Sequence, residues 1–446
     1  MGPTIPTIPL RNAAYICDSC LKSPRPLYNV LARRAYTIAT PPHSQNASRQ
    51  APRRPEHKHG SRALKNAQST KIRLHVSRRP YSTGSDPISA TMRGTTVLSD
   101  RRLVSLSGPD TAKFLQGLIT NNVDSTRLSP FYSAFLDARG RMLWDVFIWV
   151  WPELVAKAGH WACYIDVDAE EAESLRKHLK RHKLRSKVTI QEVPTQGPEG
   201  IRVWAAWSGA HEQVKETSEI AGFEDPRMPG VYRYLANADR EELIEGIQPT
   251  PEKYYKVQRY MHGVAEGPRE IVRETTLPME ANVDLSGGID FKKGCYLGQE
   301  LTIRTKHTGV VRKRILPVMF HPQHAESGGQ VVFDESFEPK ISPGIDVKAL
   351  DETKALKKGR ATGKIVAAIG NVGLATCRLE NMTAMKISAE GGTFQPGMEF
   401  GIEINGQVVK VEPVLHNWFV ERKETLWDTK VKKLSAAEQH AVNELD

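Results

Sequence analysis

KGCYLGQE, at residues 293–300, is the stretch from which the rest of this chain is best interpreted. It places Cys295 between two glycines, directly before a segment at about 299–306 that is predicted to be a short helix. The partial positive charge of a helix start and the charges of Lys292 and Lys293 both favour a thiolate over a thiol. A thiolate binds metals and attacks electrophiles, so this segment is a candidate site. The alternative is a tight loop whose cysteine is only a small apolar filler, because cysteines outside disulfides are usually buried.

The positive charge of the chain lies at its amino-terminal end. The sequence of 446 residues is long enough for two or three domains. Residues 1–85 hold 15 Lys and Arg but only Asp18 and Glu56 as acids, a net charge of +13. The remaining 47 basic and 49 acidic residues give the body a net charge of −2. A nearly neutral body argues against a nucleic-acid-binding surface, so we expect no nucleic-acid partner.

Residues 1–88 have the composition of a mitochondrial transit peptide, rich in Arg, Ser and Pro and poor in acids. Processing is expected near the RRPYS run at 78–82. A disordered RNA-binding arm is the alternative, since low hydrophobicity and high charge predict disorder in either case. No stretch reaches the roughly 20 apolar residues that cross a bilayer, so no membrane partner is expected. The predicted location is the mitochondrial matrix.

Five cysteines are scattered along the chain. Cys17 and Cys20 form a C-x-x-C in the arm, but no second pair completes a zinc site. Cys163 and Cys377 lie in apolar, strand-like runs and are predicted to be packing residues. Thiols this widely separated indicate a reducing compartment.

The folded body is predicted to begin near Met92 and to have an α+β composition. It contains neither a G-x-G-x-x-G nor a Walker loop, which argues against a nucleotide-binding fold. Hydrophobic periodicity and turn residues predict a strand at 97–107, a helix at 110–120, a hairpin at 132–151, a helix at 169–182, and strands at 188–190 and 201–207, followed by a helix at about 251–263.

Turn-rich stretches suggest the domain boundaries. A Pro- and Gly-rich linker near 191–200 is predicted to divide residues 92–314 into two subdomains. Short strands and Gly/Pro turns over 315–428 are typical of a small antiparallel β-barrel, with an inserted surface loop at 323–358. Residues 429–446 are expected to be a tail.

Three stretches resemble a known family: LPMEAN at 277–282, KGCYLGQE at 293–300 and GVVRKR at 309–314. Together they look like the mitochondrial iron–sulfur cluster assembly factors, a branch of the folate-binding T-protein (GcvT-like aminomethyltransferase) superfamily. The resemblance covers 92–320 well and 321–430 more loosely. It implies two interwoven ferredoxin-like α+β domains around a central cavity, plus a carboxy-terminal antiparallel β-barrel.

The resemblance also implies a place for tetrahydrofolate, which the superfamily's enzymes bind in that cavity to transfer a one-carbon unit. The family's acidic pair maps onto Trp144 and Asp145, so one acid is missing. The glutamate that holds the pterin maps onto Met261, and a thioether cannot accept two N–H donors. Asp145, Arg259 and Asn282 are the implied cofactor-binding residues. Both departures weaken aminomethyl transfer as the activity.

The folate enzymes do not need Cys295, whereas iron–sulfur clusters are held by cysteine thiolates. One cysteine cannot ligate a cluster alone, so a partner or a small thiol must complete the ligand shell. A single ligand predicts transient, transferable binding of the cluster. Lys293 is expected to offset the negative charge of a thiolate-bound cluster.

The other residues of the motif have expected roles around the same sulfur. Gly294 and Gly298 allow backbone angles that other residues avoid, so the sulfur can be presented to solvent. Gln299 and Glu300 are expected to orient the loop, and Tyr296 to contact a partner. The alternative is that each of these residues only shapes the loop and contacts no ligand.

The resemblance therefore implies a factor that assists maturation of [4Fe–4S] proteins. The implied partners are A-type iron–sulfur scaffold proteins, and the implied clients are aconitase-type and radical-SAM lipoyl and biotin synthase enzymes. This interpretation requires no enzymatic activity. The alternatives are a tetrahydrofolate-dependent methyl- or aminomethyltransferase and, against the neutral body, a tRNA-modification accessory protein.

Overall fold

The computed structural model describes residues 93–150, 152–215, 220–325, 332–388 and 391–427. The predicted transit peptide, the Cys17/Cys20 pair and the tail at 429–446 lie outside the described residues. No helix in the described part of the chain is both long enough and apolar enough to cross a bilayer.

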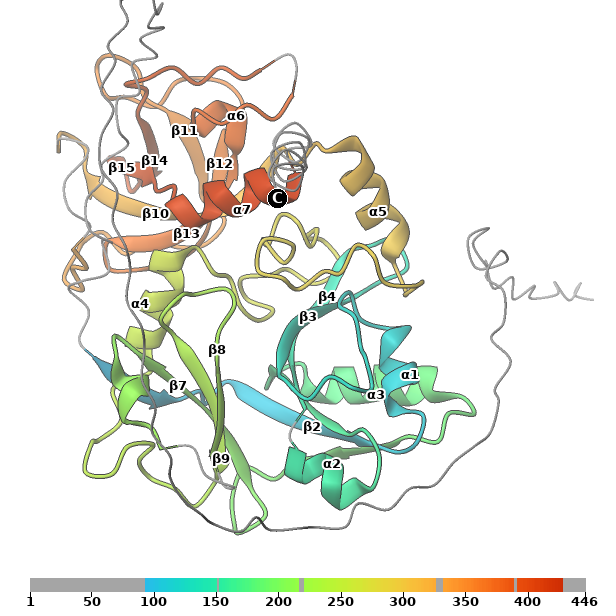
Figure 1. The fold of residues 1–446 in the computed structure, drawn as a ribbon. Helices are drawn as coiled ribbons and strands as arrows, with labels where there is room; N and C mark the ends of the chain where they lie inside the picture. The colour runs from blue at the N-terminus through green and yellow to red at the C-terminus, as the bar shows by residue number, and fades with distance from the viewer. Residues whose placement is uncertain (1–92, 151, 216–219, 326–331, 389–390, 428–446) are drawn as a thin grey trace, which may run out of the picture. The chain divides into compact units, whose positions relative to one another are not determined.

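A five-stranded antiparallel sheet in the order β3-β4-β5-β2-β6 forms the first layer (Figure 1). Its strands and helices are β2 (Arg101–Ser107), α1 (Thr111–Gln116), β3 (Phe131–Leu136), β4 (Met142–Trp149), α2 (Pro152–Ala158), β5 (Cys163–Asp168), α3 (Ala172–Lys183) and β6 (Thr189–Glu192). Helix α3 buries Leu175 and Leu179 against one face of this sheet. Every residue of β4 is buried, because both faces of the strand are covered.

A second sheet has the order β1-β7-β9-β8. Its elements are β1 (Gly94–Val97), β7 (Ile201–Trp207), the 3₁₀-helix η2 (Ala210–Gln213), β8 (Ile220–Glu224), β9 (Tyr232–Asn237) and the helix α4 (Lys253–His262) that follows. The two sheets meet through aromatic side chains. Phe223 of β8 lies 4.7 Å from Trp149 and 5.6 Å from Phe147, measured between ring centroids.

The prediction of one strand at 97–107 was wrong. Val97 ends β1, which pairs with β7 in the second sheet, and Arg101 begins β2, which pairs with β5 and β6 in the first. The chain crosses between sheets at 98–100, and this crossing interweaves the two α+β parts. The helix expected at 110–120 is also shorter, because the chain beyond Gly117 turns to bond the segment at 287–288.

The carboxy-terminal strands close into an antiparallel barrel in the order β10-β13-β12-β11-β14-β15 (Figure 1). The remaining elements are α5 (Gln299–Thr308), β10 (Lys313–Pro322), β11 (Asp346–Ala349), β12 (Gly363–Ile369), β13 (Val372–Arg378), α6 (Leu379–Met382), β14 (Phe400–Ile404), β15 (Gln407–Pro413) and α7 (Asn417–Trp427). Strand β11 lies inside the segment 323–358, which we expected to be a surface loop. Its Val347 is fully buried and completes the barrel wall, so that expectation was wrong for this strand.

Candidate functional site

Cys295 is exposed, whereas Cys163 and Cys377 are buried. It lies four residues before the first residue of α5. Burial raises the pKa of the Cys163 thiol well above its ordinary value and that of Cys377 to about 12, so both remain neutral thiols. Of the cysteines that the structure describes, Cys295 is therefore the one whose sulfur can reach a solvent-borne ligand.

The cysteine segment is fixed on the turn that follows α1. Lys293 Nζ donates hydrogen bonds to the carbonyl oxygens of Ile119 (2.6 Å) and Asn121 (2.7 Å). Further along the segment, the N–H of Leu297 donates to the carbonyl of Gly117 at 3.0 Å. The exposed sulfur is thus carried between two anchored residues, which limits the positions that it can take.

Lys293 is directed into the protein rather than along the surface. Burial lowers the pKa of its ammonium to about 7, and the ammonium also lies 5.0 Å from the ring centre of Tyr296. The two carbonyl acceptors stabilise the charged form. Lys293 therefore contributes to the shape of the segment directly, and its predicted effect on a bound cluster stays a prediction.

Two glycines allow the cysteine segment to touch the β3–β4 hairpin. Gly298 has a φ of +80°, and a Cβ there would lie 2.2 Å from the carbonyl oxygen of Asp137. Gly140 in the hairpin turn has a φ of +79°, and its Cβ would lie 2.9 Å from the carbonyl oxygen of Gly298. The prediction that Gly294 also needs special backbone angles was wrong, because its φ lies outside the left-handed region and a Cβ would meet no atom within 4 Å.

Replacement of Gly298 with Ala should destabilise the fold by about 2–5 kcal/mol, because backbone strain adds to the collision with Asp137. The matched variant Gly294→Ala should change stability by less than about 1 kcal/mol, since open space surrounds that position. Urea denaturation of both variants measures the difference. Equal midpoints would contradict the close approach of the hairpin and the cysteine segment.

Tyr296 is buried, with 6% of its surface exposed, so its side chain does not offer the partner contact that we predicted. Burial raises the pKa of its hydroxyl to about 12. The N–H of Tyr296 donates to Gln299 Oε1 at 3.2 Å, which joins the segment to the first turn of α5. Glu300 is exposed in the same turn.

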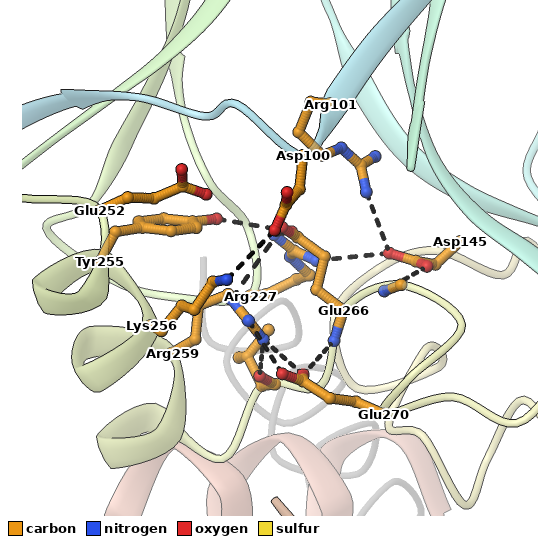
Figure 2. A network of polar contacts seen from close by, with 12 residues as sticks. Asp100, Arg101, Asp145, Arg227, Glu252, Tyr255, Lys256, Arg259, Glu266 and Glu270 are labelled. Atoms are coloured by element: carbon orange, nitrogen blue, oxygen red, sulfur yellow. Dashed lines mark hydrogen bonds and ion pairs between the residues drawn. The ribbon is translucent and has the colours of Figure 1, made fainter. Parts of the chain in front are cut away.

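Asp145 lies in a different environment, a buried network of arginines and carboxylates (Figure 2). The network joins the two sheets. On one side Asp166 of β5 binds Arg101 Nε at 2.6 Å and Arg233 Nη1 of β9 at 2.9 Å. On the other side Glu266 pairs with Arg227 Nη2 at 2.6 Å and also with Arg233. These contacts place charges from both sheets in one buried cluster.

Sequence reasoning missed this network, because its members are spread over residues 101–270. Arg259 was predicted to face a cofactor, but its guanidinium binds both oxygens of Glu270, at 2.6 and 3.0 Å. One signal was present: Arg233 stands in the mostly apolar run YRYLAN at 232–237. A charge in such a strand indicates a buried ion pair.

Asp145 itself has one satisfied and one unsatisfied oxygen. Oδ1 accepts a hydrogen bond from the N–H of Gly267 at 3.0 Å. Oδ2 lies 4.0 Å from Arg101 Nη1 and 3.9 Å from Arg227 Nη1, and all three of these buried atoms lack a hydrogen-bond partner.

This arrangement does not fit tetrahydrofolate. Asp145 is 4% exposed, and the guanidiniums of Arg101 and Arg227 stand where a pterin ring would have to approach its free oxygen. Met261, at the position of the family glutamate, is buried in the core. A folate site at Asp145 therefore stays a prediction that requires these side chains to move.

Asn282 lies against the first barrel strand, β10, and has no contact with Asp145 among its hydrogen bonds. Its Nδ2 donates to the carbonyl of Ile315 at 2.7 Å, and its Oδ1 accepts from Arg314 Nη1 at 3.2 Å. Arg314 also binds both oxygens of Asp284, at 2.8 Å each. Asp284 Oδ2 accepts from the indole N–H of Trp427 at 2.7 Å, so these groups tie α7 to the first barrel strand.

Acid should weaken the Asp145 network. Asp225 also belongs to this network, because it binds Arg227 Nη2 at 2.8 Å. Burial opposes ionisation of Asp225 and Glu266, but the neighbouring arginines outweigh it and hold the pKa of both carboxyls below the ordinary value. Because these native pKa values lie below the unfolded ones, the stability that the carboxylates contribute is present at neutral pH. It is lost as the pH falls from about 4.5 through the native pKa values.

We therefore expect the free energy of unfolding to fall between about pH 5 and pH 3, and Glu266→Gln to make this slope shallower. The measurement is urea denaturation at a series of pH values. The matched control is Glu173→Gln, because Glu173 is an exposed carboxylate of α3 with a salt bridge to Arg176. A slope unchanged by Glu266→Gln would contradict the ionised, buried state of that carboxyl.

The geometry limits what the cysteine segment can do chemically. In the described part of the chain, no three His, Cys, Asp or Glu side chains gather into a metal site. Cys295 can therefore supply one thiolate, and any iron bound there needs further ligands from another molecule.

Comparisons with known proteins agree with the resemblance and with the fold class. A family model described as "CAF17, C-terminal beta-barrel domain" matches residues 312–418. The chain is 60% identical over 375 residues to the "Iron-sulfur cluster assembly factor IBA57 homolog, mitochondrial" of Phaeosphaeria nodorum, covering 84% of this chain and 92% of that relative. The homologue from Pyricularia oryzae is 44% identical over 306 residues, covering 67% and 75%. The names of these relatives confirm the predicted mitochondrial location.

A solved structure shares the fold. The glycine cleavage system aminomethyltransferase T from Bartonella henselae superposes with a TM-score of 0.51 at 12% identity, covering 74% of this chain and 87% of that chain. Together with the closed barrel, this likeness confirms the predicted T-protein-like α+β fold.

Proposed function

Because the chain belongs to the family of mitochondrial iron–sulfur cluster assembly factors that includes the IBA57 homologues, we propose that Cys295 is a transient ligand of a cluster in transit to [4Fe–4S] proteins. The cluster is cargo rather than a resident cofactor. The observation that carries the proposal is the exposed thiol of Cys295 on an anchored segment. The residues that the structure describes contain no complete metal site, so this thiol would act as one ligand among several.

The proposed chemistry is an exchange of ligands at iron. The Cys295 thiol loses its proton as its sulfur binds iron, and the thiolate is released again when the cluster moves on. Because a single thiolate holds the cluster weakly, the other ligands come from a partner, for which A-type scaffold proteins are proposed. The proposed place of this transfer is the mitochondrial matrix.

The test is complementation of cells that lack this protein. Cys295→Ser should fail to restore aconitase activity and protein lipoylation, although the variant is present at the wild-type level. Both readouts depend on [4Fe–4S] enzymes. Cys377→Ala, which removes a buried thiol, should restore both. Full rescue by Cys295→Ser would refute the ligand role.

A further inference from the structure

Two adjoining hollows form a groove between α5 and the barrel. The first, of about 360 Å³, is lined along α5 by Leu301 and Thr305 and on its other side by Leu277 and Val311. The second, of about 570 Å³, is lined by the loop at 269–280 and by the barrel strands β10, β12 and β13. Glu280 and Lys313 line both hollows, so the two hollows lie next to each other.

The first hollow lies directly behind the cysteine segment. Gly140 and Leu301 both line it, and a Cβ on Gly140 would be 2.9 Å from Leu301 Cβ as well as from the Gly298 carbonyl oxygen. Its lining is largely apolar. A chain that follows α5 away from Cys295 therefore passes over an apolar surface before it reaches the barrel.

The barrel end of the groove carries unbalanced positive charge. Lys313 of β10 and Arg378 of β13 are directly opposite each other across the two strands, and both line the second hollow. Like charges in this position repel, and no carboxylate in the described part of the chain forms a salt bridge with either. Burial lowers the pKa of the Arg378 guanidinium, and the nearby Arg360 lowers it further because it adds to the positive charge there.

The acids of the groove do not neutralise this pair. Glu270 is held by Arg259. The Glu280 carboxylate accepts a hydrogen bond from the N–H of Leu277 at 3.2 Å and lies beyond ion-pair distance of Lys313 and Arg378. Asp346 lies 3.5 Å from Lys364, which it neutralises. An added carboxylate would therefore relieve the repulsion between Lys313 and Arg378, and a guanidinium binds a carboxylate through two parallel hydrogen bonds.

We propose that this groove receives an extended segment of the cluster-carrying partner protein, with apolar side chains along α5 and acidic side chains at Lys313 and Arg378. The proposal rests on the function proposed above, because a partner that shares a cluster with Cys295 must already lie against the start of α5. Each hollow has the size of a site that encloses a few side chains. Charge complementarity selects the acidic character of the segment.

The test is titration calorimetry of the full chain with a cluster-free A-type scaffold protein. The double variant Lys313→Glu/Arg378→Glu should bind at least about tenfold more weakly, and its affinity should depend less on salt than that of the wild type. Lys313→Gln/Arg378→Gln should show a smaller loss in the same direction. Lys180→Glu, an exposed lysine on α3, should bind like the wild type.

Several results would overturn the proposal. The first is an affinity of the Lys313→Glu/Arg378→Glu variant within twofold of the wild type. The second is an equal loss of affinity in Lys180→Glu. The third is that the wild type does not bind the scaffold. Circular dichroism melting shows whether the variants remain folded, and a folded Gln double variant keeps the test decisive if the Glu variant unfolds. Cys295→Ser should bind the cluster-free scaffold normally, so a failed groove and a failed ligand role give different outcomes.

Discussion

Replacement of Cys295 with Ser is expected to lower the amount of cluster bound in a complex with an A-type scaffold by more than about tenfold. The physical reason is the identity of the ligand. Iron in these clusters prefers the soft thiolate, and a serine hydroxyl is neither soft nor ionised at neutral pH. Anaerobic reconstitution followed by visible absorbance measures the bound cluster.

The buried cysteines supply matched controls for this experiment. Cys163→Ala removes a thiol from the core of the first sheet, and Cys377→Ala removes one from the core of the barrel. Both variants should therefore retain the absorbance. Equal absorbance for Cys295→Ser and the wild type would exclude Cys295 as a ligand. A loss in all three variants would instead indicate a general effect on folding.

Replacement of Arg233 with Met is expected to destabilise the protein by about 3–5 kcal/mol, because it removes one of the arginine partners of three buried carboxylates and leaves their negative charge only partly compensated. Arg233 is fully buried and pairs with Asp166, Asp225 and Glu266. Arg233 lies in β9 of the second sheet and Asp166 in β5 of the first, so the loss should affect the whole interwoven body rather than one strand.

The control is the same substitution at an exposed arginine. Arg139 has 68% of its side chain exposed and lies 2.7 Å from Asp137 in the hairpin turn. Because water screens such a pair, Arg139→Met should cost less than about 1 kcal/mol. Urea denaturation compares the two variants. A value for Arg233→Met as small as that for Arg139→Met would show that the network does not hold the sheets together.

Local patterns in the sequence predict local structure here. The hairpin at 132–151 appears as β3 and β4, and the strand predicted at 201–207 is β7, because alternation and turn residues act over a few neighbours. The position of helix α5 was also predicted, since glycines stand at both of its ends. The crossing at 98–100 was not, because the pairing partners of β1 and β2 are about 60 to 110 residues away.

The candidate site was predicted unevenly for the same reason. The motif left open whether Cys295 is presented to solvent or packed as an apolar filler, and the structure shows that it is exposed. The inward direction of Lys293 depends on the turn after α1, and the burial of Tyr296 depends on its place in the main hydrophobic core. The pairing of Arg233 with Glu266 likewise depends on tertiary contacts that no local pattern encodes.

The most direct measurement is the alkylation rate of Cys295 by iodoacetamide, followed by mass spectrometry. It is made in the isolated protein, in the complex with the cluster-free scaffold, and in the complex that carries the cluster. We predict rapid modification in the first state, modification in the second, and protection in the third, where the sulfur is bound to iron. Modification of Cys295 in the cluster-loaded complex at the rate found without cluster would contradict the account.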